Sequence, residues 1–84
     1  MNREQAIPKL KEIFSLNFNI DNEFKEENYN QLLTRYFAFS AIDITYLYVL
    51  IEKKFNIKIN RKLLTAYQLN TINGIIDVIL ESTV

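Results

Sequence analysis

The stretch SAIDITYLYVLIEKKFNIKI, residues 40–59, decides the fold. Its apolar side chains recur every three or four residues, which is the spacing that lines one face of an α-helix. Ser40 is a preferred helix N-cap, and Asp43 stands three residues later, where an acidic side chain completes a capping box. We therefore predict a helix over residues 41–54 that Asn56 interrupts.

This predicted helix has two apolar faces. Five side chains share the face toward the core at about 100° per residue: Ile44, Leu47, Tyr48, Ile51 and Phe55. Ile42, Tyr46 and Val49 lie on the opposite face, near Lys53. Because so small a domain seldom buries both sides of a helix, either a partner or the segment 19–30 covers this second strip. We expect a partner.

Upstream, helical spacing predicts an amphipathic helix over residues 6–17, with Pro8 in its first turn, where a missing N–H costs nothing. Residues 19–30 are polar and acidic, and we predict that they form a long loop. A single turn of helix is expected around residues 32–37.

Downstream, we predict a short third helix over residues 61–67 and a fourth over 72–80, capped by Asn70 or Thr71. The sequence thus predicts one all-α, four-helix domain over residues 1–84, with a long loop between the first two helices. Seven side chains are expected to be buried together: Phe14, Ile44, Leu47, Ile51, Phe55, Ile59 and Ile76.

Composition excludes several classes of function. The chain has no cysteine and no histidine, which excludes thiolate metal sites, cysteine nucleophiles and histidine bases. Its single glycine, Gly74, excludes a Gly-rich phosphate loop and, inside a helix, costs about 1 kcal/mol relative to alanine. We expect no catalytic residues, no metal site and no enzymatic activity.

Charge and hydropathy predict where the protein acts. Ten basic residues balance ten acidic ones, so no net field favours nucleic acid or a membrane surface. No apolar run approaches the roughly 20 residues of a membrane span, and the first residues lack the apolar core of a signal peptide. We expect a cytoplasmic protein.

Residues 40–59 resemble the second helix of acyl and peptidyl carrier proteins, whose pattern is Asp-Ser-Leu-Asp, a helix and a final Phe-x-Ile-x-Ile. That ending matches residues 55–59. IFSLNFNI, residues 13–20, is similar to the end of the family's first helix, and NTINGIIDVI, residues 70–79, to its last helix. The resemblance spans the chain and implies the carrier proteins' four-helix bundle.

The resemblance places alanine where carrier proteins have their modified serine. Counting back from residues 55–59 without a gap aligns Ala41 with that serine, Ser40 with the preceding Asp and Ala38 with the motif's Gly. In carrier proteins the hydroxyl accepts 4'-phosphopantetheine, whose thiol holds the cargo. Ala41 has no hydroxyl, so we expect no cofactor. The alternative is attachment at Ser40, which we interpret as a plain N-cap.

The resemblance implies a non-enzymatic accessory or scaffold protein that docks on a partner enzyme of peptide modification or natural-product biosynthesis. Its docking residues would be Ile42, Tyr46, Val49 and Lys53, because carrier proteins dock through this helix. A homodimer through the same helix is also open. Two alternatives remain: an active acyl or peptidyl carrier with phosphopantetheine on Ser40, and an unrelated small helical interaction module.

Two charged clusters stand apart in the sequence. Residues 53–62 contain five basic side chains and no acidic one, whereas four carboxylates gather in the predicted loop: Asp21, Glu23, Glu26 and Glu27. The clusters could form a docking site for an acidic partner or an intramolecular clasp. They could also be charges solvated at helix ends.

Overall fold

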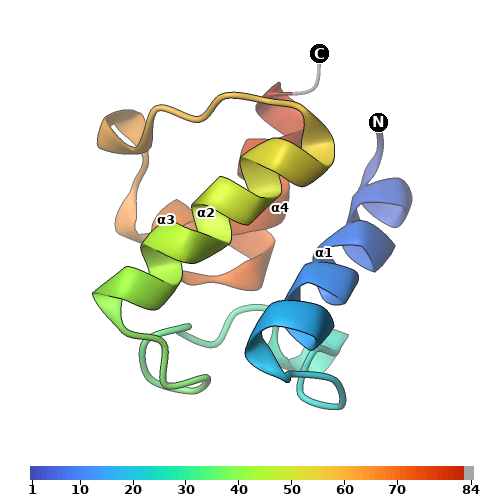
Figure 1. The fold of residues 1–84 in the computed structure, drawn as a ribbon, viewed down its shortest axis with the longest axis vertical. Helices are drawn as coiled ribbons and strands as arrows, with labels where there is room; N and C mark the ends of the chain where they lie inside the picture. The colour runs from blue at the N-terminus through green and yellow to red at the C-terminus, as the bar shows by residue number, and fades with distance from the viewer. Residues whose placement is uncertain (83–84) are drawn as a thin grey trace.

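The computed structural model describes residues 1–82 and contains four α-helices, two short 3₁₀-helices and no strand within that range. The α-helices are α1 (Arg3–Phe18), α2 (Ala41–Phe55), α3 (Ala66–Asn70) and α4 (Ile72–Ser82). The 3₁₀-helices are η1 (Glu26–Asn28), between α1 and α2, and η2 (Arg61–Leu63), before α3. Figure 1 shows α2 crossing in front of α4, with α1 beside them. The predicted all-α class with four helices is confirmed.

Helix α1 begins earlier than its apolar pattern predicts. The Asn2 side chain accepts a hydrogen bond from the Gln5 N–H, and the Gln5 side chain accepts one from the Asn2 N–H, both at 2.9 Å. This capping box starts the helix at Arg3, so the prediction that Pro8 lies in the first turn is wrong. The helix ends at Asn19, whose φ of 55° is the left-handed conformation that asparagine tolerates.

Helix α2 has the predicted capping box. The Ser40 hydroxyl accepts the Asp43 N–H at 3.1 Å, and the Asp43 carboxylate accepts the Ser40 N–H at 2.9 Å. The helix runs to Phe55, one residue beyond the predicted end, and Asn56 closes it with a φ of 54°. The predicted start is therefore confirmed, because both partners of the cap are local in sequence.

The predicted third helix over residues 61–67 is wrong. Its first half forms η2, and the α-helical turn of α3 begins only after Thr65. The Thr65 hydroxyl accepts the Gln68 N–H at 3.2 Å, while the Gln68 side chain accepts the Thr65 N–H at 2.9 Å. This third capping box divides the segment into two elements.

The core is centred on an aromatic cluster around Phe14. Its ring centroid lies 5.0 Å from that of Phe24, 5.8 Å from Phe39 and 6.1 Å from both Phe18 and Phe37. Rings at these separations attract one another beyond the effect of their burial. The cluster ties α1 to the segment that leads into α2.

Five of the seven predicted core side chains are buried, and two are not. The buried ones are Phe14, Leu47, Ile51, Phe55 and Ile76. Ile44 and Ile59 are only partly buried and pack against the edge of the core. Ile44 stays partly exposed because it lines a groove between α2 and η2, and Ile59 lies in the irregular segment that joins these two elements.

Helices α3 and α4 approach each other closely at Gly74. A Cβ atom added at this position would lie 2.5 Å from the Gln68 Cα and would also collide with the Tyr67 carbonyl oxygen. The Gly74 N–H donates to the Thr71 hydroxyl at 2.9 Å, so the cap of α4 lies at the same point. The glycine that weakens α4 as an isolated helix is therefore required by the packing.

We predict that Gly74→Ala lowers the free energy of unfolding by about 3 kcal/mol, because the added methyl group meets backbone atoms that cannot move aside. Urea denaturation followed by circular dichroism measures this loss. Asp77→Ala, at an exposed position of the same helix, is the control and should change stability by no more than about 0.5 kcal/mol. Equal stabilities for the two variants would contradict the close approach.

Candidate docking face on helix α2

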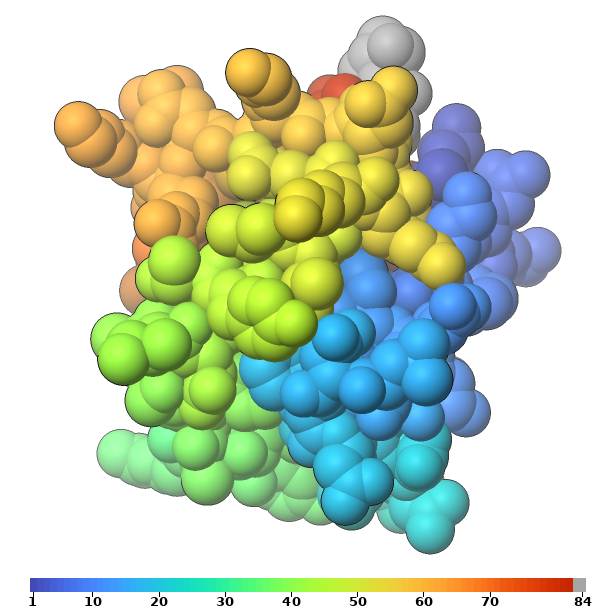
Figure 2. All heavy atoms as spheres, in the orientation of Figure 1, coloured from blue at the N-terminus to red at the C-terminus, as the bar shows by residue number. Residues whose placement is uncertain are grey.

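The outer face of α2 exposes an apolar strip. Ile42 is 80% exposed, Tyr46 47% and Val49 41%, and the neighbouring Lys53 is exposed as well. Figure 2 shows α2 crossing the front of the molecule, with the chain around residues 19–30 at its lower edge. That segment does not cover the strip, so the interpretation in which it does is wrong. The structure thus places the four predicted docking residues on one open face.

Tyr46 differs from its neighbours because it is partly anchored on α1. Its ring makes an edge contact with Phe18 at 5.8 Å, and its hydroxyl donates to the Asn17 side-chain oxygen at 3.4 Å. Ile42 and Val49 are the freer members of the strip. On the same side of α2, the Lys54 ammonium lies 3.1 Å from the Glu12 carboxylate, which further fixes α2 against α1.

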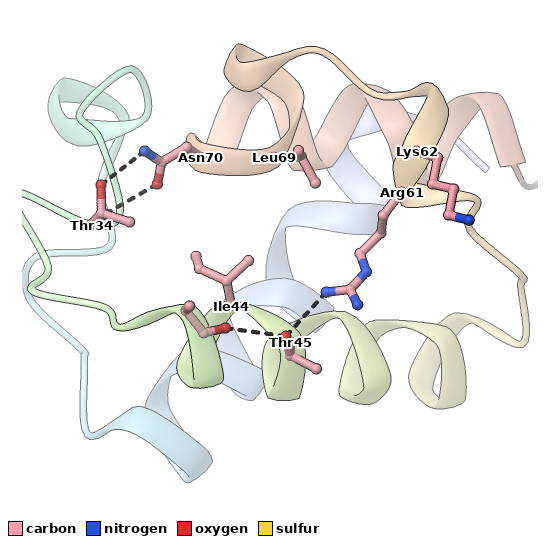
Figure 3. Close-up of a pocket in the computed structure, with 8 residues that line it drawn as sticks. Thr34, Ile44, Thr45, Arg61, Lys62, Leu69 and Asn70 are labelled. Carbon is pink, nitrogen blue, oxygen red and sulfur yellow. Dashed lines mark hydrogen bonds between the residues drawn. The ribbon is translucent and has the colours of Figure 1, made fainter.

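A groove of about 490 Å³ borders the strip on the side of α3. Figure 3 shows Ile44 of α2 and Leu69 of α3 pointing into the space between the two helices. Arg61 reaches from η2 toward α2, and its guanidinium donates to the Thr45 hydroxyl at 3.3 Å. Ala41, at the start of α2, lines the same groove. The groove is therefore apolar at its walls and cationic at its rim.

Tyr48 of α2 contacts Arg61, which forms part of the rim of this groove. Its hydroxyl donates to the Gln68 carbonyl oxygen at 3.0 Å, which joins α2 to α3. Burial raises the pKa of Tyr48 to about 12, although the positive charge of Arg61 acts in the opposite direction. The Arg61 guanidinium carbon lies 5.9 Å from the centre of the Tyr48 ring, a cation–π separation. Tyr48 is thus a neutral, structural hydroxyl at physiological pH.

A second hollow, of about 470 Å³, lies beside the other half of α2. Val49 and Lys53 form one side of it, and Ile57 and Lys58 the other. Glu52 also lines it, but its carboxylate accepts the Ile59 N–H at 2.9 Å and so holds the chain that follows the helix. The outer face of α2 therefore carries an apolar strip with two hollows along it, one beside each half of the helix.

The residues at the start of α2 have the geometry of a helix cap. The Ser40 hydroxyl accepts a backbone N–H, and Ala41 occupies the first helical position. Ala38 has a φ of 57°, a left-handed conformation that glycine adopts without strain. The described residues 1–82 contain no group of three side chains that could hold a metal ion.

The structure keeps the two charged clusters apart. Among residues 1–82 the ion pair that forms is Lys54 with Glu12, so the alternative of an intramolecular clasp between residues 53–62 and the acidic segment is wrong. Sequence reasoning noted Arg61 only as one charge in a run, and it did not find the groove beneath it. The sequence signal for this groove was Thr65, which caps α3 and separates it from η2. Because of this break, η2 lies across the groove from α2.

Comparison with known proteins gives no relative for this chain. No protein-family model, curated protein or solved structure matches it. No helix within residues 1–82 is long and apolar enough to cross a membrane. The interpretation of the α2 face therefore depends on its geometry and on the pattern of the sequence.

We predict that Ala38→Gly stabilises the protein by about 0.5–1 kcal/mol. The left-handed conformation costs an L-residue about 1–2 kcal/mol, and the greater freedom of glycine in the unfolded chain offsets about half of that gain. Thermal denaturation measures the effect as a rise in Tm. Ala41→Gly, at a helical position, is the matched control and should lower the Tm. A lower Tm for Ala38→Gly would contradict the strained backbone.

Proposed function

We propose that this protein is a degenerate carrier-protein-like domain that docks on a partner enzyme through the outer face of α2 and carries no phosphopantetheine. The observation that carries the docking is the exposure of Ile42, at 80%, on a strip with Tyr46 and Val49. Covering such apolar area releases about 25 cal/mol per Å², so a partner surface that fits the strip is stabilised on contact. The two hollows beside it provide the relief that a specific interface needs.

Two features at the start of α2 support the carrier-like part of the proposal. The motif glycine of carrier proteins aligns with Ala38, whose backbone is left-handed, as a glycine position would allow. The modified serine aligns with Ala41, at the first helical position, where a side chain projects from the helix end. The assignment to peptide modification or natural-product biosynthesis follows from the same resemblance.

The proposed absence of phosphopantetheine follows from the chemistry of Ala41, because its side chain has no hydroxyl to accept the group. Ser40 is the neighbouring hydroxyl, and it already accepts the Asp43 N–H in the cap of α2. Modifying it would place the bulky group on the cap itself. This is the reason for preferring a docking role over the active-carrier alternative.

The docking role does not depend on family membership. An unrelated helical interaction module with the same exposed strip on α2 would bind by the same contacts. The two interpretations differ at the start of the helix, where only the carrier-like one implies a lost attachment position at Ala41. The attachment and docking experiments therefore address separate parts of the proposal.

We predict that co-expression with a broad-specificity phosphopantetheinyl transferase leaves the intact mass of the protein unchanged. Mass spectrometry of the purified chain measures this directly. Ala41→Ser tests the alignment, because a phosphopantetheine adduct on this variant alone would place the lost attachment position at residue 41. An adduct on the unaltered protein that disappears in Ser40→Ala would establish the active carrier instead.

We predict that a photo-cross-linking amino acid at Ile42 forms a discrete adduct with one enzyme in cells that express the protein. Leu32 has the same 41% exposure as Val49 but lies outside the strip, so a cross-linker at Leu32 is the control and should not give this adduct. Introducing Val49→Glu should remove the Ile42 adduct, since it places a charge against an apolar surface. Circular dichroism should show the fold unchanged.

Two results would contradict docking on an enzyme. Equal adducts from residues 42 and 32 would show random collision instead of docking. An adduct of two copies of the chain, dispersed by Val49→Glu, would make the strip a homodimer interface.

A further inference from the structure

Four cations border the two hollows beside the outer face of α2. Lys53 and Lys58 border the second hollow, and Arg61 and Lys62 line the first. Among residues 1–82 none of the four is within ion-pair distance of an acidic side chain. Each hollow therefore has two positive charges at its edge that form no ion pair, although the Glu52 carboxylate also lines the second hollow.

The two carboxylates of α2 are held by hydrogen bonds within the chain. Asp43 accepts the Ser40 N–H in the helix cap, and Glu52 accepts the Ile59 N–H. Both bind the local backbone, and among residues 1–82 neither forms an ion pair with a neighbouring cation. The face consequently presents an excess of positive charge although the chain as a whole is neutral.

The balancing negative charge lies elsewhere. Asp21, Glu23, Glu26 and Glu27 belong to the segment around η1, which Figure 1 shows toward the opposite end of the molecule from η2. The longest dimension of the fold is 29 Å. Charges separated by more than about 8 Å at physiological ionic strength are largely screened from each other. The neutral net charge thus conceals two regions of opposite sign.

We infer that the partner surface seated on α2 is an amphipathic helix whose apolar ridge is flanked by Asp and Glu side chains. This inference rests on the proposed docking function and names the chemistry of its partner. Ile42, Tyr46 and Val49 have the i, i+4, i+7 spacing of an apolar helix stripe, and two helices pack when side-chain ridges of one enter grooves of the other. The two hollows along α2 provide depressions that side chains of a partner helix can enter.

Arg61 has the geometry to recognise a partner carboxylate. Its guanidinium makes a single long hydrogen bond, 3.3 Å, to the Thr45 hydroxyl, which leaves most of its N–H donors available. A carboxylate at the groove rim would form charge-assisted hydrogen bonds, which are about twice as strong as neutral ones. An apolar neighbour of that carboxylate would meet Ile44 and Leu69 in the groove. The groove therefore fits an apolar side chain with an acid next to it.

The test uses two synthetic helical peptides that share one leucine stripe and differ only in flanking residues, all Glu in one and all Lys in the other. Each is titrated into the ¹⁵N-labelled full chain and followed by NMR. We expect the Glu peptide to bind at least about tenfold more tightly, with the largest shifts at Ile42, Ile44 and Val49. Its affinity should fall as salt is raised, because exposed charges are screened.

Charge-reversal variants sharpen the result. Lys53→Glu with Lys58→Glu changes two exposed side chains outside the core and should reduce or invert the preference for the Glu peptide. Lys11→Glu, an exposed position on α1, is the matched control and should leave the preference unchanged. Arg61→Gln keeps a hydrogen-bonding side chain without its charge, so it should weaken the Glu peptide without unfolding the protein.

The outcomes separate this inference from the docking function beneath it. Equal binding of both peptides on the strip would overturn the acidic partner and leave docking intact. If neither peptide shifted the strip, the acidic partner and the docking function would both be contradicted. Tight binding of a single-stranded oligonucleotide to the same cations, with the Glu peptide inactive, would make nucleic acid the partner and overturn the inference.

Discussion

The packing of aromatic rings around Phe14 is the interaction on which the rest of the structure depends. Phe39 lies 5.8 Å from Phe14 and 4.7 Å from Phe18, and the next residue is the cap of α2. Because these rings fix the chain one residue before the cap, they orient α2 against α1, while the Ser40–Asp43 cap sets where the helix begins. Leu47 and Ile51 then face the core, and the Ile42 side of the helix faces outward.

A second constraint keeps that outward face open. The segment between α1 and α2 is held against the far helices by backbone hydrogen bonds, from Leu33 N–H to the Asn70 carbonyl at 2.8 Å and from Asn73 N–H to the Tyr29 carbonyl at 3.0 Å. A segment held there cannot also fold across α2. The strip is therefore exposed because the segment between α1 and α2 makes its backbone hydrogen bonds elsewhere. The cations beside the strip are exposed for the same reason.

Sequence reasoning predicted those parts of the fold whose causes are local. The start of α2 was predictable because Ser40 and Asp43 are both partners of one cap, and the two faces of the helix followed from its periodicity. The start of α1 was missed because its cap, Asn2 with Gln5, lies among polar residues without apolar periodicity. The division at Thr65 was missed for a related reason: a cap inside an apolar pattern is easily mistaken for part of the helix.

The long-range features of the site were beyond the sequence. Gly74 has no visible role until α3 is placed against α4, and Arg61 becomes the rim of a groove only when η2 stands across from Thr45. The strip itself was identified from periodicity, but its exposure depended on where the 19–30 segment packs. The residues of the strip were thus predictable from the sequence, whereas their exposure and the hollows beside them were not.

The central claim is that the α2 strip is open in the isolated protein and covered in its working assembly. Hydroxyl-radical footprinting by mass spectrometry, on the isolated chain and on the chain in lysate of its own cells, measures this residue by residue. We predict strong labelling of Ile42 and Tyr46 in the isolated chain and clear protection of both in the lysate. Tyr36, which is 46% exposed and lies away from the strip, should be labelled equally in both samples. Equal labelling of Ile42 in the two samples would contradict it.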